Sequence, residues 1–328
     1  MSSRREVLAM LGAAGALALA PRALASSGTV LTATDVHVKD YPTVQAVRWI
    51  GEQLAKETHG RLSLRQYHSG QLGRESEAVD MARFGAIDLT RVYTGALNNA
   101  FPLTASLCLP YLFESVAHLR RAIDGPVGAA VLAGFEARGL VGLAIYDSGA
   151  RCFYNTRRPI VEPADLHGLK FRVPPSDMFM ALMRQLGANP TPLPYGEVFS
   201  ALQTQLIDGA ENNVRSFHSS RQFEAARFWS QSEHSYAPDV LVMSKARFEA
   251  MAPADRERMR RLGAASVPVL RTLWDEGADA SRRALLEAGV AMNPVDLPAF
   301  RRAAEPMQRQ YREHATVGPL YRQIRSLA

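Results

Sequence analysis

The chain of 328 residues contains only two cysteines, Cys108 and Cys152. Neither lies in a CxxC pair or in a cysteine and histidine spacing typical of a metal site, so the sequence offers no zinc or redox centre. A disulfide requires the two side chains to lie close together, and two cysteines provide no disulfide framework. We expect two separate buried thiols, no bound metal and no cofactor.

The sequence also lacks the motifs of common enzyme classes. It has no GxSxG nucleophile elbow, no HExxH helix, no GxGxxG turn after a strand and no phosphate-binding loop. We therefore expect a protein that is not an enzyme. The formal charge is only +6, of which the residues before position 26 contribute +2 through three arginines and one glutamate. The other arginines are scattered without interleaved aromatic residues, which argues against nucleic-acid binding.

The apolar run near the N-terminus is short. It covers residues 7–20, follows Arg4 and Arg5, and precedes a small-x-small cleavage site at residues 23–25. This order is typical of an export signal over residues 1–25, and the run is too short to anchor the chain in a bilayer. The paired arginines also resemble a twin-arginine signal, with an ordinary secretory signal as the alternative. We expect a periplasmic protein.

Strand and helix patterns alternate through the chain, whose length favours two domains. Strands are expected over residues 29–33, 61–65 and 87–92, again from residue 151, and over residues 169–173 and 240–244. Helices are expected over residues 41–58, 75–84, 176–186, 196–205 and 253–287. Such alternation indicates right-handed βαβ units with largely parallel sheets. Two successive α/β units leave a crevice, and ligands of open α/β sheets bind outside the carboxyl ends of the strands.

Two arginines and an asparagine, Arg151, Arg172 and Asn212, fall at predicted strand ends in the second unit. A guanidinium can make two parallel hydrogen bonds to one carboxylate, and a buried arginine needs a partner. The three side chains are therefore a candidate grip for an acid. The alternatives are a salt bridge from Arg172 to a residue such as Asp177, packing between domains for Arg151, and a turn position for Asn212.

Several short motifs occur in an order and spacing that resemble one known family. They are Gln71–Glu75, Arg83–Asp88, Leu109–Phe113 and Ala201–Thr204, together with the segments around Arg151, Arg172 and Asn212. Over essentially its whole mature length the chain resembles the extracytoplasmic solute-binding subunit of tripartite ATP-independent periplasmic (TRAP) transporters. Three further segments resemble the branch of that family that binds hexuronates such as glucuronate and galacturonate: residues 35–42, 211–216 and 233–235.

The resemblance implies an α/β protein with the two-domain type II periplasmic-binding-protein fold. It implies a ligand cleft between discontinuous domains and a long helix in the C-terminal half. Domain I would comprise residues 26–149 and about 238–276, and domain II residues 150–237 and about 277–328. The resemblance also implies a monomer that captures a sugar acid and delivers it to the small and large membrane subunits of a TRAP transporter.

A uronate presents one carboxylate and several hydroxyls, so its binder needs acceptors as well as arginines. The candidate ligand-binding residues are Arg172, Arg151, Asn212, Glu75, Arg91, His37, Asp40, Tyr195 and Phe217. The two aromatic residues are candidates for stacking on a sugar ring. Three of these residues have other interpretations: Glu75 as a helix N-terminal residue favoured by the dipole, His37 as a satisfied surface histidine, and Phe217 as a core residue.

Three other functions stay open on the sequence alone. The chain could bind another organic acid, such as an aldonate, a C4 dicarboxylate or a 2-oxoacid. It could be a secreted enzyme that acts on acidic sugars, which turnover of a uronate would reveal. It could also be a receptor subunit that passes the same acid to a sensor, in which case the membrane subunits would be missing from its genomic neighbourhood.

Overall fold

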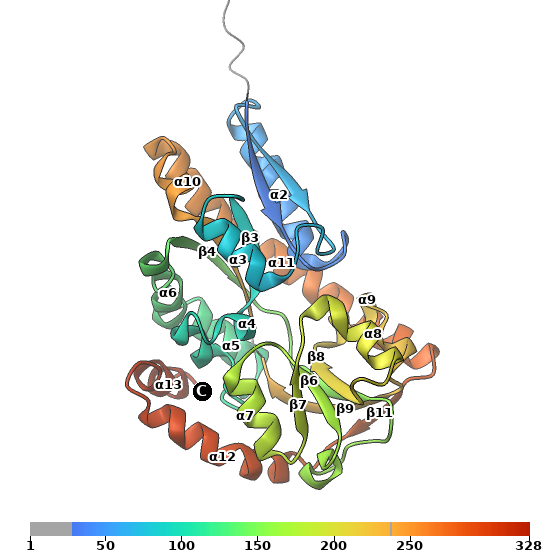
Figure 1. The fold of residues 1–328 in the computed structure, drawn as a ribbon. Helices are drawn as coiled ribbons and strands as arrows, with labels where there is room; N and C mark the ends of the chain where they lie inside the picture. The colour runs from blue at the N-terminus through green and yellow to red at the C-terminus, as the bar shows by residue number, and fades with distance from the viewer. Residues whose placement is uncertain (1–27, 237) are drawn as a thin grey trace, which may run out of the picture.

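The computed structural model describes residues 28–236 and 238–328. The export signal predicted over residues 1–25 lies outside them. Figure 1 shows two α/β units, an upper one that begins with the blue N-terminal elements and a lower one that contains the green and yellow strands. Within the described ranges, no helix is both long enough and apolar enough to cross a membrane.

The first unit contains a five-stranded sheet. In spatial order its strands are β2 (Leu62–Tyr67), β1 (Thr29–Thr34), β3 (Leu89–Tyr93), β10 (Asp239–Ser244) and β4 (Leu140–Tyr146). Its helices are α2 (Pro42–Glu57), α3 (Glu75–Arg83), α4 (Thr94–Leu97), η1 (Pro102–Leu107), α5 (Val116–Ile123), α6 (Pro126–Ala133), η2 (Glu136–Arg138) and α10 (Lys245–Glu249). Helix α2 illustrates why they form: Pro42 opens its first turn, and Val47, Ile50 and Leu54 give it one buried apolar face.

The second unit contains a six-stranded sheet. Its strands in spatial order are β11 (Ala291–Pro294), β9 (Phe228–Ser235), β5 (Arg151–Asn155), β8 (Gly209–Asn212), β6 (Lys170–Val173) and β7 (Asn189–Pro192). Its helices are η3 (Pro163–Leu166), α7 (Asp177–Gln185), η4 (Tyr195–Glu197), α8 (Val198–Gln203), α9 (Val214–Ser219) and η5 (Gln222–Glu224), followed near the C-terminus by α12 (Leu297–Glu313) and α13 (Gly318–Arg325). Ser176 caps α7 by accepting a hydrogen bond from the Phe179 amide.

Each sheet is parallel except for one strand. In the first sheet β10 runs antiparallel to both of its neighbours, β3 and β4, and in the second sheet β5 runs antiparallel to β8 and β9. All other pairs are parallel, as the alternation of strands and helices predicted. Strand β5 is the one with which the chain first enters the second sheet, and β10 is the one with which it returns to the first. They begin just after the predicted boundaries near residues 149 and 238, and the boundaries themselves stay a prediction.

Helix α11 (Pro253–Glu287) extends over 35 residues and has the bounds predicted for the long helix. Leu262 and Leu270 in its first part belong to the core under the first sheet. Leu285 near its end belongs to the core of the second unit, beside Tyr154 and Trp229. One continuous helix is therefore shared by both units.

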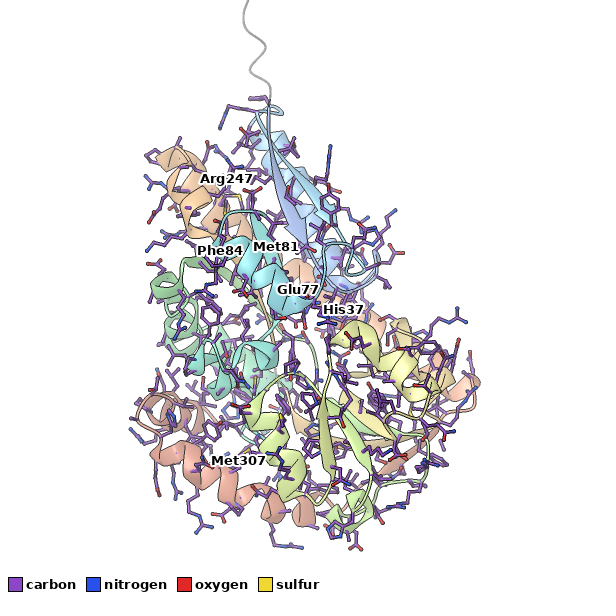
Figure 2. The ribbon with its side chains drawn as sticks, viewed as in Figure 1. His37, Glu77, Met81, Phe84, Arg247 and Met307 are labelled. Carbon is purple, nitrogen blue, oxygen red and sulfur yellow. The ribbon has the colours of Figure 1, made fainter. Side chains whose placement is uncertain are left out.

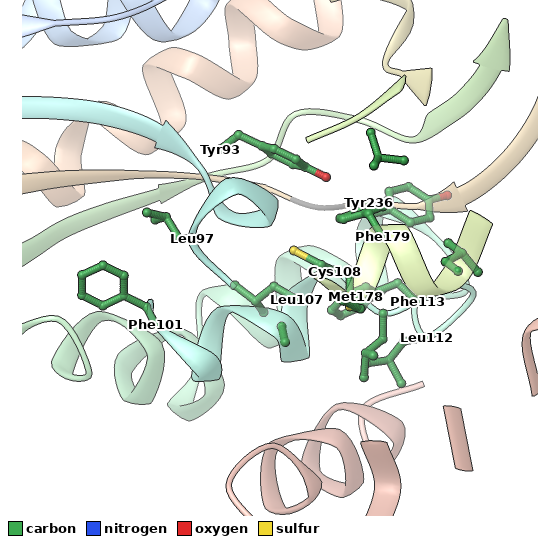
Figure 3. Close-up of a cluster of buried hydrophobic side chains, with 14 of the residues drawn as sticks. Tyr93, Leu97, Phe101, Leu107, Cys108, Leu112, Phe113, Met178, Phe179 and Tyr236 are labelled. Atoms are coloured by element: carbon green, nitrogen blue, oxygen red, sulfur yellow. The ribbon is translucent and has the colours of Figure 1, made fainter. Parts of the chain in front are cut away.

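The largest hydrophobic cluster also crosses from one unit to the other. It joins Tyr93, Leu97 and Leu107 of the first unit to Met178 and Phe179 on α7 of the second, as Figure 3 shows. The last helix, α13, packs on η1 and α6, and His118 Nε2 lies 2.8 Å from the Ile324 carbonyl oxygen. The C-terminal helix thus contacts segments that the predicted division assigns to domain I, because its apolar face completes their core.

The two cysteines lie in different clusters. Cys108 is part of the cluster that joins the units, and Cys152 is part of the core of the second unit. Both are buried and free, so the prediction of two separate thiols is confirmed. Burial raises the pKa of each thiol to about 12.

Candidate functional site

Three of the predicted residues lie at one edge of the second sheet. Arg151 opens β5, Arg172 lies on β6 and Asn212 ends β8. Because β5 runs antiparallel to β8, the start of β5 pairs with the end of β8, with Cys152 opposite Asn212. Strand β6 runs parallel to β8, so its carboxyl end points to the same edge. This topology places the two guanidinium groups and the amide together.

The first sheet presents polar residues at the matching edge. Arg91 lies on β3, and Asp239 opens the antiparallel strand β10 directly opposite Tyr93. His37 follows the end of β1, and Glu75 is the first residue of α3. The polar edges of the two sheets therefore face each other.

A cavity lies between these edges, and seven of the nine predicted site residues line it. Its wall consists of Val36, His37, Glu75, Arg91, Tyr93, Ser148, Arg151, Arg172, Tyr195, Asn212, Asn213, Ser216 and Asp239. Figure 2 shows the labelled His37 at the seam between the upper and lower units. The enclosed space is only about 30 Å³, far below the roughly 300–1,000 Å³ of typical ligand pockets. A ligand of the size of a sugar can therefore enter only if the two units move apart.

Contacts across the cleft hold the units together. The Tyr41 hydroxyl lies 2.8 Å from Ser216 Oγ. At the mouth of the cleft, Arg74 Nη2 forms an ion pair of 2.7 Å with Glu197 Oε1, and both side chains are exposed. These polar contacts can break and re-form as the units separate, since water can replace each partner.

Arg91 is the centre of an acidic cluster on the first unit. Its guanidinium donates to Asp35 Oδ2 at 3.1 Å, to Glu75 Oε1 at 3.0 Å and to Asp239 Oδ1 at 3.1 Å. Burial raises the pKa of Glu75 and of Asp239 above the usual range, although Arg91 opposes this shift. Three carboxyl groups surround one cation, so this wall of the cavity is rich in hydrogen-bond acceptors.

Arg151 is held by Glu211 on the second unit. Its Nη2 donates to Glu211 Oε1 at 2.8 Å, its Nε donates to Glu211 Oε2, and its Nη1 donates to Asn212 Oδ1 at 3.0 Å. Burial alone would raise the pKa of Glu211, but Arg151 and His234 outweigh burial and hold this pKa at about 2. The charge of Arg151 is therefore already neutralised within the protein.

Arg172 differs from the other two buried arginines of the cavity. Only 3% of its surface is exposed, and its Nε donates to the Leu193 carbonyl oxygen at 2.8 Å. Within residues 28–236 and 238–328 it forms no ion pair with a carboxylate, and its terminal nitrogens form no hydrogen bond. The alternative partner, Asp177, instead begins α7, and its amide donates to Asn99. Burial lowers the pKa of Arg172, which is the sign of a cation that lacks a full counter-charge.

His37 is buried rather than on the surface. Its ring stacks on Tyr41 with centroids 3.7 Å apart and meets the edge of Tyr195 at 4.9 Å. Burial first, and the charge of Arg91 second, lower the pKa of His37 well below its usual value, so the ring is neutral. Its Nδ1 is buried without a hydrogen-bond partner in the described structure. A ligand hydroxyl in the cavity would satisfy such an atom.

The structure does not bring Asp40 or Phe217 into the cavity. Asp40 is exposed, because the turn that joins Val38 to Tyr41 directs it outward. Phe217 is fully buried in the core of the second unit, where its ring lies 4.4 Å from that of Tyr154. Both residues are therefore removed from the candidate site.

The sequence interpretation missed several wall residues. Tyr93, Ser148, Asn213, Ser216 and Asp239 line the cavity but were not among the candidates. The Arg151 guanidinium lies 4.4 Å from the centre of the Tyr93 ring. For Asp239 a signal existed, since a carboxylate directly before the apolar strand 240–244 marks a strand end. No group of three or more potential metal ligands is found in the described parts of the chain.

Comparisons with known proteins agree with this architecture. Residues 34–314 match the model of a family described as bacterial extracellular solute-binding protein, family 7. A TRAP periplasmic solute-binding protein from Bradyrhizobium sp. BTAi1, crystallised with α/β-D-galacturonate, is 44% identical, with a TM-score of 0.89 over 91% of this chain and 100% of that one. One from Chromohalobacter salexigens with bound D-glucuronate is 34% identical, with a TM-score of 0.88 over 91% and 100%. The 2,3-diketo-L-gulonate-binding periplasmic protein of Escherichia coli is 32% identical over 78% of each chain.

Proposed function

Because the chain belongs to family 7 of the bacterial extracellular solute-binding proteins, we propose that it captures a hexuronate in its interdomain cleft for a TRAP transporter. The preferred ligand is D-galacturonate or D-glucuronate. The related structures from Bradyrhizobium and Chromohalobacter, which hold these two acids, support this assignment.

Arg172 is the observation that carries the proposal. Arg91 and Arg151 each have carboxylate partners inside the protein, whereas in the described parts of the chain Arg172 has only a backbone carbonyl as its partner. A buried guanidinium with free terminal nitrogens matches the two oxygens of a carboxylate in charge and in geometry. We therefore assign the ligand carboxylate to Arg172, with Asn212 beside it.

The opposite wall suits the hydroxyl groups of a sugar. Glu75 and Asp239 supply carboxyl oxygens, and the unpartnered Nδ1 of His37 supplies one further polar atom. Acceptors of this kind bind hydroxyl donors and repel a second carboxylate. This division of the cavity, cationic on one side and acidic on the other, favours a monocarboxylate with several hydroxyls over a dicarboxylate.

The same proposal covers location and partners. The protein would be exported to the periplasm by residues 1–25, act as a monomer and deliver its ligand to the small and large membrane subunits. The family is one of binding proteins, and we propose that this member performs no catalysis. Another sugar acid is the second candidate, because a relative is named for binding 2,3-diketo-L-gulonate.

A thermal-shift comparison tests the ligand class. A ligand at a hundredfold excess over its dissociation constant stabilises the folded state by about 2.7 kcal/mol, which raises the melting temperature by a few degrees. D-Galacturonate and D-glucuronate should produce this rise, whereas galactose and glucose should not, because neither supplies an anion for Arg172. Equal shifts with the neutral sugars would overturn the proposal, and a larger shift with 2,3-diketo-L-gulonate would favour the second candidate.

A further inference from the structure

A second, larger cavity lies on the surface near the C-terminus, outside the ligand cleft. It encloses about 790 Å³ between α12, α13 and the segment that contains Tyr111. Its wall consists of Tyr111, Glu114, Arg301, Arg302, Glu305, Gln308, Arg312, Tyr321, Arg322 and Arg325. None of these residues lines the interdomain cavity. We infer that this cavity binds a phosphate group.

The charges of this cavity are unbalanced. Five arginines and two glutamates line it. Glu114 pairs with Arg325 at 3.1 Å, and Glu305 pairs with Arg309, which lies outside the wall. Both acids are therefore already engaged.

Three arginines of the wall are left without a carboxylate. Arg301 and Arg302 form no ion pair within the described ranges, and Arg322 Nη1 donates only to the Arg312 carbonyl oxygen at 3.1 Å. Their guanidinium groups gather in one concave surface. All three side chains are exposed, and their excess positive charge can attract an anion into the cavity.

Tyr111 supplies an independent sign of a ligand. It is 92% buried, since only 8% of its surface is exposed, yet it lines the cavity and its hydroxyl has no partner in the described structure. Its backbone also has φ of +55°, a left-handed conformation that is costly for a tyrosine and that concentrates at functional positions. The interdomain site makes no use of the Leu109–Phe113 motif to which Tyr111 belongs.

The donors favour phosphate over a single carboxylate. Guanidinium groups bind both anions through paired hydrogen bonds. A phosphate group carries about two negative charges at neutral pH and presents three acceptor oxygens. Three unpaired arginines match that number of charges and acceptors better than they match one carboxylate. The source of the phosphate is either a free anion or the head group of phosphatidic acid, a phospholipid whose phosphate is also a monoester.

Calorimetric titration of the purified protein with inorganic phosphate and pyrophosphate tests the inference. Replacing both Arg301 and Arg322 by glutamine should weaken binding by about tenfold or more, because each substitution removes charged hydrogen bonds. The matched control is Arg227→Gln, which removes an exposed arginine whose Nη1 donates to the Ala288 carbonyl oxygen and which does not line the cavity. This control variant should bind phosphate with an affinity within about twofold of that of the wild type. The inference would be overturned if the protein bound neither anion and also no vesicles. It would also be overturned if the double variant bound phosphate as tightly as the wild type.

Sedimentation with vesicles separates the two sources. Vesicles that contain phosphatidic acid should bind the protein, vesicles of phosphatidylcholine alone should not, and free phosphate should abolish the binding, if the source is a lipid head group. Binding of the free anions alone would identify a soluble phosphate compound. None of these results depends on the ligand of the interdomain cleft.

Discussion

The Nε atom of Arg172 donates to the Leu193 carbonyl oxygen at 2.8 Å, and this bond fixes the guanidinium at the cleft without neutralising it. Arg151, on the same edge of the sheet, is instead bound through two nitrogens to Glu211. The two arginines that the sequence placed together therefore have different roles. Arg151 is bound within the folded structure, whereas Arg172 is the arginine that we propose binds the anionic ligand.

This difference predicts opposite effects on stability without ligand. Arg151→Ala should destabilise the protein by about 3–5 kcal/mol, because it leaves the Glu211 carboxylate buried and unpaired. Arg172→Ala should leave the free energy of unfolding unchanged or slightly higher, since it removes a buried charge that has no carboxylate partner. Urea unfolding measures both. Arg157→Ala is the control, because Arg157 is half exposed in its ion pair with Asp208. Equal losses in the Arg151 and Arg172 variants would contradict these roles.

The low pKa of Glu211 predicts a dependence of stability on pH. Its pKa is about 2 in the folded protein against 4.5 for an ordinary glutamate. The ionised carboxylate therefore contributes stability that is fully present above pH 4.5 and is lost as the pH falls toward 2.

Comparison with Glu211→Gln isolates this contribution from those of other acids. The difference in unfolding free energy between wild type and variant should be constant from pH 7 to about 5 and shrink from there to pH 3. Urea unfolding at each pH provides the measurement. A difference that stays the same over the whole range would show that Glu211 has no lowered pKa.

Movement of the two units predicts a change of shape with ligand. The small volume of the cavity requires the cleft to open for entry, and contacts from both sheets favour closure around the acid. Solution X-ray scattering should give a smaller radius of gyration with galacturonate than without it. An unchanged radius with binding confirmed would place the site within one unit.

The ion pair at the cleft mouth predicts a modest effect on ligand release. Arg74→Gln removes the contact with Glu197 in the closed form. Because exposed ion pairs contribute only about 0.2–1 kcal/mol, dissociation should become faster by about fivefold at most. Stopped-flow measurement of the release rate tests this, with Arg309→Gln as a control on a distant exposed pair. A slower release would contradict the expected role of the pair.

The buried thiols predict chemical inertness. The pKa values of Cys108 and Cys152 are raised to about 12 by burial, so neither forms a thiolate at neutral pH. A thiol reagent should detect no cysteine in the folded protein and two after denaturation. If fewer than two thiols react after denaturation without reductant, the missing thiols have been oxidised.

The sequence predicted the alternating architecture well because apolar periodicity reports directly on burial. Arg172 stood out for the same reason: a permanent charge on an otherwise apolar strand must have a partner. The sequence could not show that β10 returns antiparallel to the edge where β3 ends. Asp239 was therefore missed, although its carboxylate lies 3.1 Å from Arg91.

The errors have local geometric causes. Ser216 and Phe217 are adjacent on α9, and a helix rotates by 100° per residue, so only one of them can face the cleft. The structure directs Ser216 to the cavity and Phe217 to the core. Asp40 was misplaced because a single turn after His37 reverses the direction of the side chains. Such rotations depend on tertiary packing, which periodicity alone does not fix.

Calorimetric titration of Arg172→Lys with galacturonate, together with an unfolding curve without ligand, tests the central claim most directly. Lysine keeps the charge but loses the paired donors, and one hydrogen bond to a charged group contributes about 1.5–3 kcal/mol. Affinity should therefore fall by about tenfold to a hundredfold, while the unfolding curve of the unliganded variant stays that of the wild type. Unchanged affinity, or a collapse of stability without ligand, would show that Arg172 serves the fold and not the acid.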